Sequence, residues 1–389
     1  MKNYSLDMGT DNKKLNIIYL FPGPIYRPNS SDFKDRFEML SEFCEGEVYS
    51  WTCDKAYQEY VMDNFVFRGV VVRGGGFITR LRLAIHIIRA TANLSKRKKV
   101  DVIICYDPIF TGIVGAFLKM VFRCKLIIEL NNSDFVKAMQ IEGGKSLKTK
   151  SKIILSNLLF RISLLSSDGI KILTDRQKDN LLYRYNPKRI FCFHDFVSTS
   201  FFEKDLKKTD KYLLFVGYPF YRKGIDIFVK AFEKIADQFP DFEILLIGHQ
   251  LQDEAKNNLG TWCKQVKFIK PMFYEELKPY FLNCYGFVLP SREEGMGRVL
   301  IEAMACAKPL IGANVGGIPA LINDGENGLL FESEDIDDLA QKLTLLLKDK
   351  NKARAMGEIG FQLVKERFSS KLYCDYFMQM VQEIVDNEK

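Results

Sequence analysis

The first half of the chain alternates short apolar runs with longer stretches in which apolar residues recur every three or four positions. One such stretch starts at about Asp32 and places Phe33, Phe37 and Leu40 on one face, which predicts an amphipathic helix. The apolar runs predict strands at 15–21, 65–72, 101–105, 125–130, 169–173 and 189–193. Short apolar strands separated by helices are typical of a parallel sheet with helices on both faces.

A second alternation begins after a segment that loses this periodicity. Residues 195–210 gather Ser, Thr, Lys and Asp, so we place the linker between two domains there. The apolar runs that follow predict strands at 212–216, 242–247, 266–269, 285–289, 309–312 and 328–331. At 389 residues the chain is long enough for two domains of ordinary size. The pattern predicts an α/β protein with two doubly wound, Rossmann-like domains, at 1–200 and 210–368.

The chemistry is concentrated in residues 284–306, CYGFVLPSREEGMGRVLIEAMAC, which predict a strand, a loop and a helix. Gly295 and Gly297 flank Met296, and glycines let the backbone pass close to a ligand. The N–H groups at the start of the following helix carry partial positive charge suited to a diphosphate. Glu294 precedes this helix and Glu302 lies within it. One carboxylate is therefore placed to meet a sugar and the other to meet a ribose.

This segment resembles the E-x7-E motif of family 4 glycosyltransferases, and residues 312–332, GANVGGIPALINDGENGLLFE, resemble the usual continuation of that motif. The resemblance implies a GT-B fold, in which two domains face a cleft and the last helix, 370–389, packs back on the first domain. It implies that Glu294 is a catalytic residue, which faces and orients the donor sugar and gives electrostatic support, and that Glu302 holds the nucleotide ribose. The residues implied to line the donor phosphates are Gly295, Met296, Gly297, Arg298 and Val299. Retention at the anomeric carbon, and the absence of a bound metal or other cofactor, are also implied.

A second loop, FVGYPFYRKG at 215–224, resembles the donor-phosphate loop of the same family. Gly217 stands at its first glycine, and Lys223 matches the lysine before its second glycine. A leaving diphosphate develops negative charge that fixed cations stabilise, so Lys223 is expected to be catalytic. Tyr218 stands where the family has an arginine, which leaves either Arg222 or Arg298 to supply the missing charge.

The glycine turn in ILLIGHQ, residues 244–250, resembles the segment that approaches the nucleotide base in relatives, which makes Gly248 a donor-binding candidate. His249 after it is interpreted as an ordinary loop residue.

The first half departs from the family pattern at two loops. Relatives usually end one strand with a histidine that touches the donor sugar, and this chain has Asn131 and Asn132 there. Asparagine hydrogen-bonds a sugar hydroxyl but is neither acid nor base near neutral pH, and the alternative is a turn that closes the strand. After the first strand the chain has FPGPIYRPNSSD in place of Gly-Gly, so Gly23 and Arg27 are the candidates for a weak contact.

The composition excludes several other classes of protein. The polar N-terminus and the lack of about 18 uninterrupted apolar residues predict a cytoplasmic protein. Nine cysteines without a C-x-x-C pair predict reduced thiols and neither disulfides nor zinc. The run Gly74-Gly75-Gly76 has Thr79 where a dinucleotide fingerprint needs a third glycine, which argues against a nicotinamide enzyme. The acidic Asp335-Ile336-Asp337 is interpreted as a helix cap.

The net charge of +7 is unevenly distributed. Residues 1–200 hold 31 Lys and Arg against 20 Asp and Glu, so the first half is basic and the second slightly acidic. Between Asn64 and Val100 there are nine basic residues and no acidic one, including Lys96-Arg97-Lys98-Lys99. A helix from about Ile78 carries Arg82, His86, Arg89 and Asn93 as a polar stripe. The basic segment is either a solvated surface or a site for anionic lipid headgroups; no nucleic-acid-binding motif accompanies it.

Together these features predict a hexosyltransferase-type glycosyltransferase that moves a sugar from a nucleotide-diphosphate donor to an acceptor. A lipid-linked or cell-surface polysaccharide precursor is the expected acceptor, which would place the enzyme at the inner face of a membrane. The alternatives are a nucleotide-sugar epimerase of the same fold and a non-catalytic nucleotide-sugar binding protein. The epimerase needs acid and base groups, and Asn131 and Asn132 argue against it.

Overall fold

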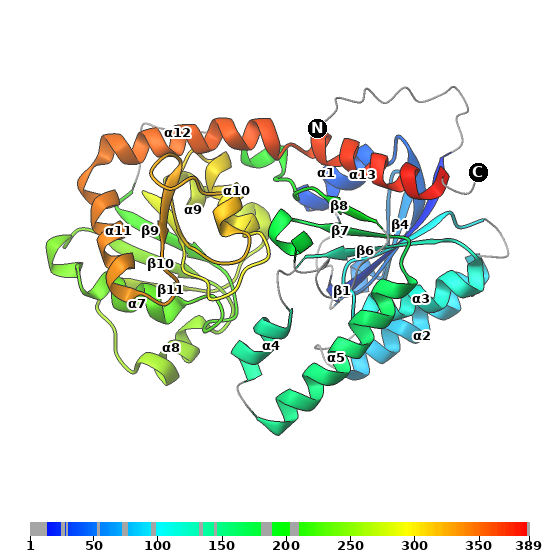
Figure 1. The fold of residues 1–389 in the computed structure, drawn as a ribbon. Helices are drawn as coiled ribbons and strands as arrows, with labels where there is room; N and C mark the ends of the chain where they lie inside the picture. The colour runs from blue at the N-terminus through cyan, green and yellow to red at the C-terminus, as the bar shows by residue number, and fades with distance from the viewer. Residues whose placement is uncertain are drawn as a thin grey trace.

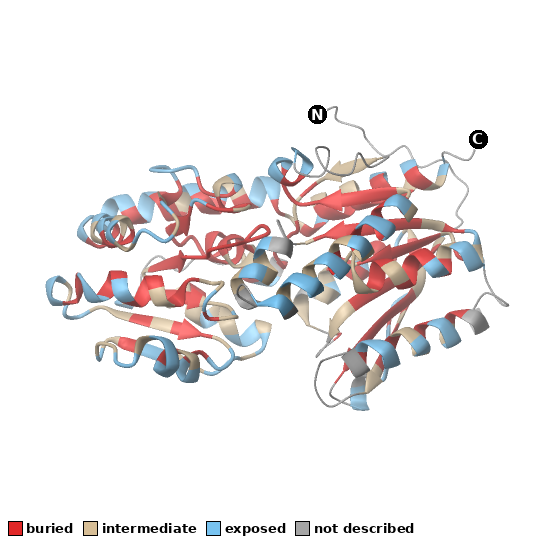
Figure 2. Ribbon diagram, turned by 60° about the horizontal axis from the view of Figure 1, so that its bottom comes forward, coloured by how far each residue is buried: buried red, intermediate tan, exposed pale blue. Residues whose placement is uncertain are grey.

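The computed structural model describes residues 14–24, 28, 30–52, 55–71, 77–94, 99–131, 135–143, 146–179, 189–202 and 210–386. They form two lobes, each built around one sheet with helices packed on both faces (Figure 1). Figure 2 shows that the strands of both sheets are mostly buried, whereas most helices expose one face. None of the described helices is both long enough and apolar enough to cross a membrane.

The sheet of the first lobe has the strand order β3-β4-β2-β1-β5-β6-β7-β8. All neighbouring strands are parallel except β3 and β4, which form an antiparallel pair at one edge. The strands are β1 (Leu15–Pro24), β2 (Cys44–Thr52), β3 (Glu59–Met62), β4 (Phe65–Val71), β5 (Val102–Cys105), β6 (Lys125–Leu130), β7 (Gly169–Ile172) and β8 (Ile190–Cys192).

The described helices of the first lobe are α1 (Ser31–Leu40), α2 (Phe77–Leu94), α3 (Phe110–Phe122), α4 (Phe135–Gly143) and α5 (Leu147–Ser166), with the 3-10 turns η1 (Lys55–Tyr57) and η2 (Thr199–Phe201). One face of the sheet packs against α2, α3 and α5 through residues such as Leu83, Val114 and Phe160. The other face packs against α1 and the last helix, α13 (Ser370–Asp386). The C-terminal segment thus completes the core of the first lobe (Figure 1).

The sheet of the second lobe is entirely parallel, in the order β11-β10-β9-β12-β13-β14. Its strands are β9 (Tyr212–Val216), β10 (Glu243–Ile247), β11 (Val266–Ile269), β12 (Gly286–Leu289), β13 (Leu310–Ala313) and β14 (Gly328–Phe331). Its helices are α7 (Ile225–Glu233), α8 (Leu251–Leu259), α9 (Tyr274–Asn283), α10 (Arg298–Ala305), α11 (Ile336–Lys348) and α12 (Lys350–Arg367), with the 3-10 turns η3 (Ala236–Gln238) and η4 (Ile318–Ala320). The strand ranges predicted for this half agree with the observed ones to within a residue.

Two strands of the first lobe were not predicted. β2, with the sequence CEGEVYSWT, carries two glutamates that interrupt the apolar pattern. Its Glu47 is nevertheless buried, because Arg68 of the neighbouring β4 forms an ion pair with it at 3.1 Å. β3 is a four-residue edge strand, EYVM, with Glu59 and Val61 exposed, so its apolar run is too short to predict a strand.

Two further expectations need correction. β1 continues to Pro24, so Gly23 lies in a strand and not in a loop. Asp195 belongs to a buried ionic cluster, and Val197 and Phe201 pack into the core of the second lobe, so the start of the predicted linker 195–210 is packed structure. Residues 203–209, the rest of that segment, lie outside the described residues.

The polar stripe on α2 also differs from expectation. His86 is half-buried with its ring 6.2 Å from that of Tyr49, whereas Leu81, Ile85 and Ile88 are exposed. The side chain of Asn93 lies outside the described residues, as do Arg27, the triplet 74–76 and the basic residues 96–98. The interpretation of Asp335 as a helix cap is confirmed, because its carboxylate accepts hydrogen bonds from the N–H groups of Asp337 and Asp338.

Candidate active site

The two loops singled out in the second half of the sequence meet at one edge of the second sheet. Strands β9 and β12 are parallel neighbours, so the loops that follow them leave the sheet side by side. The N–H of Arg292 donates to the carbonyl of Arg222 at 2.8 Å. Gly224 has a φ of +67°, and a Cβ added there would lie 1.9 Å from the carbonyl oxygen of Pro290. Only glycine therefore allows the loops to approach so closely.

Lys223 and Glu294 form a hydrogen-bonded ion pair across these loops. Their side chains are only 13% and 11% exposed, and Ser291 Oγ donates to the same carboxylate oxygen at 3.3 Å. The two residues assigned to catalysis from the sequence are thus brought together from positions 71 apart. A partly buried cation beside a carboxylate is suited to bind an anionic group and a sugar at adjacent points.

The Glu294 loop is supported from behind by the double glycine of the 312–332 segment. Gly316 has a φ of +56°, and a Cβ there would lie 1.9 Å from the carbonyl oxygen of Glu294. The N–H of Gly317 donates to that same oxygen at 3.2 Å. The glycines therefore position the loop and do not themselves belong to the ion pair.

Helix α10 begins directly after this loop. Gly297 precedes its first residue with a φ of +83°, and Gly295, Met296 and Gly297 are all buried. Glu302 is 3% exposed and forms an ion pair with Arg298, one helical turn before it, at 3.3 Å. Val299 is half-buried between them.

The arginines near this site have different partners. Arg222 is 3.4 Å from Glu293, and Arg292 makes a bidentate contact with Asp226 at 2.7 and 2.8 Å. Arg298 lies over the ring of Tyr274 at 5.1 Å. Its positive charge also lowers the pKa of Asp195 in the first lobe.

The remaining donor-binding candidates line the adjacent strand ends. A Cβ on Gly248 would lie 2.2 Å from the carbonyl of Gly217, so the turn after β10 lies directly against the turn after β9. Tyr218 is exposed, and its ring is 5.6 Å from that of His249. This exposed aromatic stands where the resemblance led us to expect an arginine.

The candidates in the first lobe are not part of this arrangement. Asn131 donates from Nδ2 to the carbonyl of Tyr106 at 3.1 Å, and its buried Oδ1 has no hydrogen-bond partner in the described part of the chain. Gly23 has open space around the position of a Cβ. Within the described residues neither one contacts the Lys223–Glu294 pair, and Asn132 lies outside them.

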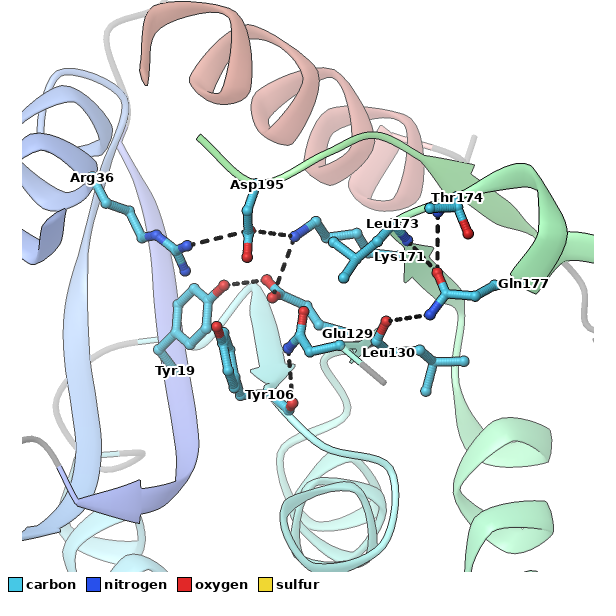
Figure 3. Close-up of polar contacts among 11 residues, drawn as sticks. Tyr19, Arg36, Tyr106, Glu129, Leu130, Lys171, Leu173, Thr174, Gln177 and Asp195 are labelled. Carbon is cyan, nitrogen blue, oxygen red and sulfur yellow. Dashed lines mark hydrogen bonds and ion pairs between the residues drawn. The ribbon is translucent and has the colours of Figure 1, made fainter. Parts of the chain in front are cut away.

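A cluster of buried charges that the sequence analysis missed lies beneath the carboxyl ends of the first sheet (Figure 3). Lys171 of β7 is 3.1 Å from Asp195 and 3.6 Å from Glu129 of β6. Arg36 of α1 is 3.5 Å from Asp195, and Tyr19 of β1 donates to Glu129. We call these five residues the ionic cluster. Its charges balance, with two cations and two carboxylates.

Burial and the neighbouring charges together determine which groups of the ionic cluster carry a proton. Burial raises the pKa of Asp195, but the charges of Lys171, Arg36 and Arg298 outweigh that effect and hold the pKa at about 2. Burial and the charge of Glu129 raise the pKa of Tyr19, so this phenol stays neutral and donates. The signal in the sequence was a charged residue inside an apolar strand, Glu129 in LIIEL and Lys171 in GIKIL. Such residues are rarely buried without a partner.

Solved structures with the same arrangement show the class of fold. Sucrose-phosphate synthase from Thermosynechococcus elongatus superposes with a TM-score of 0.79 at 19% identity over 96% of this chain and 100% of its own. The Anabaena protein HepE, in complex with UDP and glucose, does so with a TM-score of 0.72 at 15% identity over 95% of this chain and 100% of its own. Both are similar in fold to the present chain, and the predicted GT-B architecture is confirmed.

Sequence comparison relates the second lobe to a known family and most of the chain to several proteins. Residues 197–363 match the model described as "Glycosyl transferases group 1". An uncharacterised glycosyltransferase of Methanocaldococcus jannaschii is 26% identical over 77% of this chain and 81% of its own length. The N-acetyl-alpha-D-glucosaminyl L-malate synthase of Bacillus anthracis is 25% identical over 77% of this chain and 78% of its own. The second lobe thus matches the group 1 glycosyltransferases, as the resemblance to family 4 predicted, and the Methanocaldococcus jannaschii relative that spans most of the chain is named a glycosyltransferase.

Proposed function

We propose that this protein is a hexosyltransferase that moves a sugar from a nucleotide-diphosphate donor to an acceptor, with retention at the anomeric carbon. The observation that carries the proposal is the Lys223–Glu294 pair at the carboxyl edge of the second sheet. In open α/β sheets, ligands bind at this edge. The glycine-lined start of α10 beside the pair offers N–H groups to an anionic ligand.

In the proposed mechanism the diphosphate exchanges places with the Glu294 carboxylate as the partner of Lys223. The Lys223 ammonium then stabilises the negative charge that develops as the diphosphate leaves. Glu294, released from the lysine but still near Ser291, orients the donor sugar. Glu302 holds the ribose, and Gly217, Gly248, Met296 and Val299 shape the surrounding surface. No metal or other cofactor takes part in the proposal.

Arg298 is the better candidate for the cation missing at Tyr218. Both arginines contact a buried carboxylate, Arg222 that of Glu293 at 3.4 Å and Arg298 that of Glu302 at 3.3 Å. Arg298 differs in being the first residue of α10, and its charge also lowers the pKa of Asp195 in the first lobe. It therefore stands where a diphosphate bound at the helix start would face the cleft.

Activity on labelled nucleotide sugars tests the proposal. UDP-glucose is the first donor to try, because HepE has been solved with UDP and glucose. We expect transfer to an acceptor or slow donor hydrolysis by the wild type, and a rate about 10²- to 10³-fold lower in Lys223→Ala. Formation of an epimer would instead support the epimerase, and binding without turnover the non-catalytic alternative. The anomeric configuration of the product, read by NMR, tests retention separately.

One surface of the first lobe has an unusual composition, and we propose that it binds the carrier to which the acceptor is attached. Helices α2, α3 and α5 contain eight Lys and Arg residues but no Asp or Glu. α3 packs against both of the others, so the three form one layer on the sheet (Figure 1). Cationic residues alone make a solvated surface, but here they are mixed with exposed apolar side chains.

These helices carry twelve of the eighteen large hydrophobic residues that are exposed in the described part of the chain. On α5 they are Leu147, Ile154, Leu155, Leu158, Ile162 and Leu165, on α3 Phe117, Met120 and Val121, and on α2 Leu81, Ile85 and Ile88. The spacing on α5 places its six on one outward side, opposite the buried Phe160 and Leu164. Exposed apolar patches rimmed by cations are typical of membrane-binding surfaces.

We therefore propose that this layer binds an anionic lipid bilayer. The acceptor would be a lipid-linked sugar in that bilayer, such as a polysaccharide precursor. We propose for this layer the lipid-binding role that the sequence analysis considered for the basic run at residues 96–99. Of that run the structure describes only Lys99, which is exposed. Cosedimentation with phosphatidylglycerol-containing liposomes tests it. The double variant Ile154→Gln/Leu158→Gln should bind less, whereas Leu345→Gln/Ile359→Gln, at similarly exposed positions of the second lobe, should bind as the wild type does.

Salt provides a further control. Lys150→Gln/Lys152→Gln should lose binding at low salt, and the difference from the wild type should shrink as salt screens the charges within about 8 to 10 Å. A wild-type protein that fails to bind anionic liposomes at low salt would contradict this part of the proposal.

A further inference from the structure

A cavity of about 560 Å³ lies at the junction of the two lobes. Its walls come from the loops after β7 and β8, from the loop after β13, and from the segment that joins α12 to α13. None of the residues assigned above to the donor lines it. A cavity of about 300 to 1,000 Å³ is the usual size for a small-molecule site. It is therefore a second site, distinct from that of the nucleotide sugar.

Three residues that line this cavity each have a buried polar atom without a hydrogen-bond partner among the described residues: Thr174 Oγ1, His194 Nδ1 and the Tyr373 hydroxyl. Thr174 is 3% exposed and Tyr373 2%. A buried polar atom without a partner is costly, so three of them around one cavity indicate that the cavity holds something that hydrogen-bonds. The backbone N–H of Thr174 is held by Gln177 at 3.1 Å, which fixes the position of this residue (Figure 3).

The rest of the wall is aromatic. The ring of Phe193 lies 5.7 Å from that of Tyr373 and 5.9 Å from that of Tyr376, and Phe368 lies 5.1 Å from the ring of His194. Aromatic faces attract the C–H face of a sugar ring, whereas hydroxyl and imidazole groups bond its hydroxyls at the edge. The combination is suited to a ligand that is apolar on its faces and hydroxylated around its rim.

The charges around the cavity balance. The cations Arg176 and Arg367 stand beside the acids Asp175 and Glu366. Asp195, which also lines the cavity, is paired with Lys171 and Arg36. A phosphate or nucleotide would leave its charge without a dedicated partner here, so the wall favours a neutral ligand.

We infer that this cavity binds a neutral pyranose sugar between the two lobes. The sugar is either part of the acceptor or a free saccharide that acts as an effector. Because both lobes line the cavity, an occupant favours the lobe arrangement that fits it. Gly316 in its wall also touches the backbone of Glu294, which joins the cavity to the donor loop. The inference concerns binding and stands whether or not the proposed transfer occurs.

Calorimetric titration of the full chain with the methyl glycosides of glucose, galactose and mannose, and with N-acetylglucosamine, tests the inference. At least one should bind to the wild type, and Thr174→Val and Tyr373→Phe should each weaken it about tenfold, the value of one hydrogen bond. Thr174→Ser, which keeps the hydroxyl, should retain the affinity. The affinity for UDP should stay unchanged in all three variants, which separates this site from the donor site.

Binding by none of the four sugars, or binding that neither Thr174→Val nor Tyr373→Phe weakens, would overturn the inference. So would inorganic phosphate that competes with the bound sugar, because it would show an anion site. Incubation with a donor separates the two sources of the sugar: a glycosylated sugar identifies it as part of the acceptor, and a changed rate of donor hydrolysis without such a product identifies an effector. Both results support a pyranose site, and an inactive protein that still binds the sugar would contradict only the proposed transfer.

Discussion

The two lobes share a doubly wound architecture but handle charge in opposite ways. In the second lobe no described strand carries a buried charge, and the buried carboxylates Glu293, Glu294 and Glu302 stand on a loop and on helix α10 at the edge of the sheet. In the first lobe, charges enter the sheet itself, since Glu129 and Lys171 lie within strands and are fully buried. The second lobe thus uses its apolar sheet as a rigid support for the loops that we propose to bind the donor. In the first lobe, buried ion pairs and hydrogen bonds hold α1, β1, β6 and β7 together beneath the cleft.

The largest expected effect concerns the buried charges of the first lobe. Lys171→Met should lower the free energy of unfolding by about 3 to 5 kcal/mol, because it leaves Glu129 and Asp195 buried with less compensation. Urea unfolding measures it, with Lys34→Met, from an exposed pair with Glu38, as the control that should change little. If Lys171→Met unfolded at the same urea concentration as the control, the ionic cluster would not hold the lobe together.

The next effect concerns the second lobe, where we propose that charge acts on a ligand. Lys223→Ala should lower kcat about 10²- to 10³-fold while KM changes less, because the cation matters most as the diphosphate leaves. Steady-state kinetics measures this, and Lys230→Ala, an exposed lysine on α7, is the matched control. A change in KM alone would make Lys223 an anchor for the bound substrate and remove it from the leaving-group role.

Glu302→Ala should weaken nucleotide binding by roughly 1.5 to 3 kcal/mol, the value of a hydrogen bond to a charged group. Glu302 is buried beside Arg298, so Glu302→Gln is the companion variant that preserves shape and removes charge. Calorimetry with UDP gives the affinity, and circular dichroism checks the fold. Unchanged affinity in both variants would remove the ribose role.

A smaller effect distinguishes the two candidate cations. Arg298→Gln should lower kcat roughly tenfold, about one charge-assisted hydrogen bond, and Arg222→Gln should lower it less. The reason is that Arg298 is the first residue of α10, where we propose that the diphosphate binds, whereas Arg222 lies in the loop before α7. The opposite ranking in the same kinetic assay would assign the diphosphate to Arg222.

The smallest effect concerns the junction of the lobes. Burial lowers the pKa of His194, and the charge of Arg367 lowers it further. The unfolded chain therefore takes up a proton near the ordinary pKa of about 6.5 while the folded chain does not, so stability falls as pH drops below that value. His194→Gln should flatten this fall in thermal melts between about pH 7.5 and 5, and the exposed His249→Gln should not. A fall as steep in His194→Gln as in the wild type would contradict it.

How much the sequence reveals depends on whether the determining contacts are local. The apolar runs predicted the strands of the second lobe because a parallel strand buried on both faces needs apolar residues at nearly every position. β2 escaped prediction because its Glu47 becomes compatible with burial only through Arg68 on another strand. Lys223 and Glu294 could each be assigned from their loops, but the loops were assigned by resemblance, and no local signal said that they would touch.

The sequence by itself determined that this chain folds as two α/β sheets and carries the loops of a group 1 glycosyltransferase, since periodicity, glycine turns and short motifs are properties of consecutive residues. The tertiary structure alone decided which of these residues meet. The order of the second sheet joins Lys223 to Glu294, and that of the first sheet surrounds Lys171 with Asp195 and Glu129. It also decided that the apolar residues of α5 face outward and that the lobes enclose a cavity. Strand order and helix packing follow from the sum of many weak, long-range contacts, and no single stretch of sequence contains them.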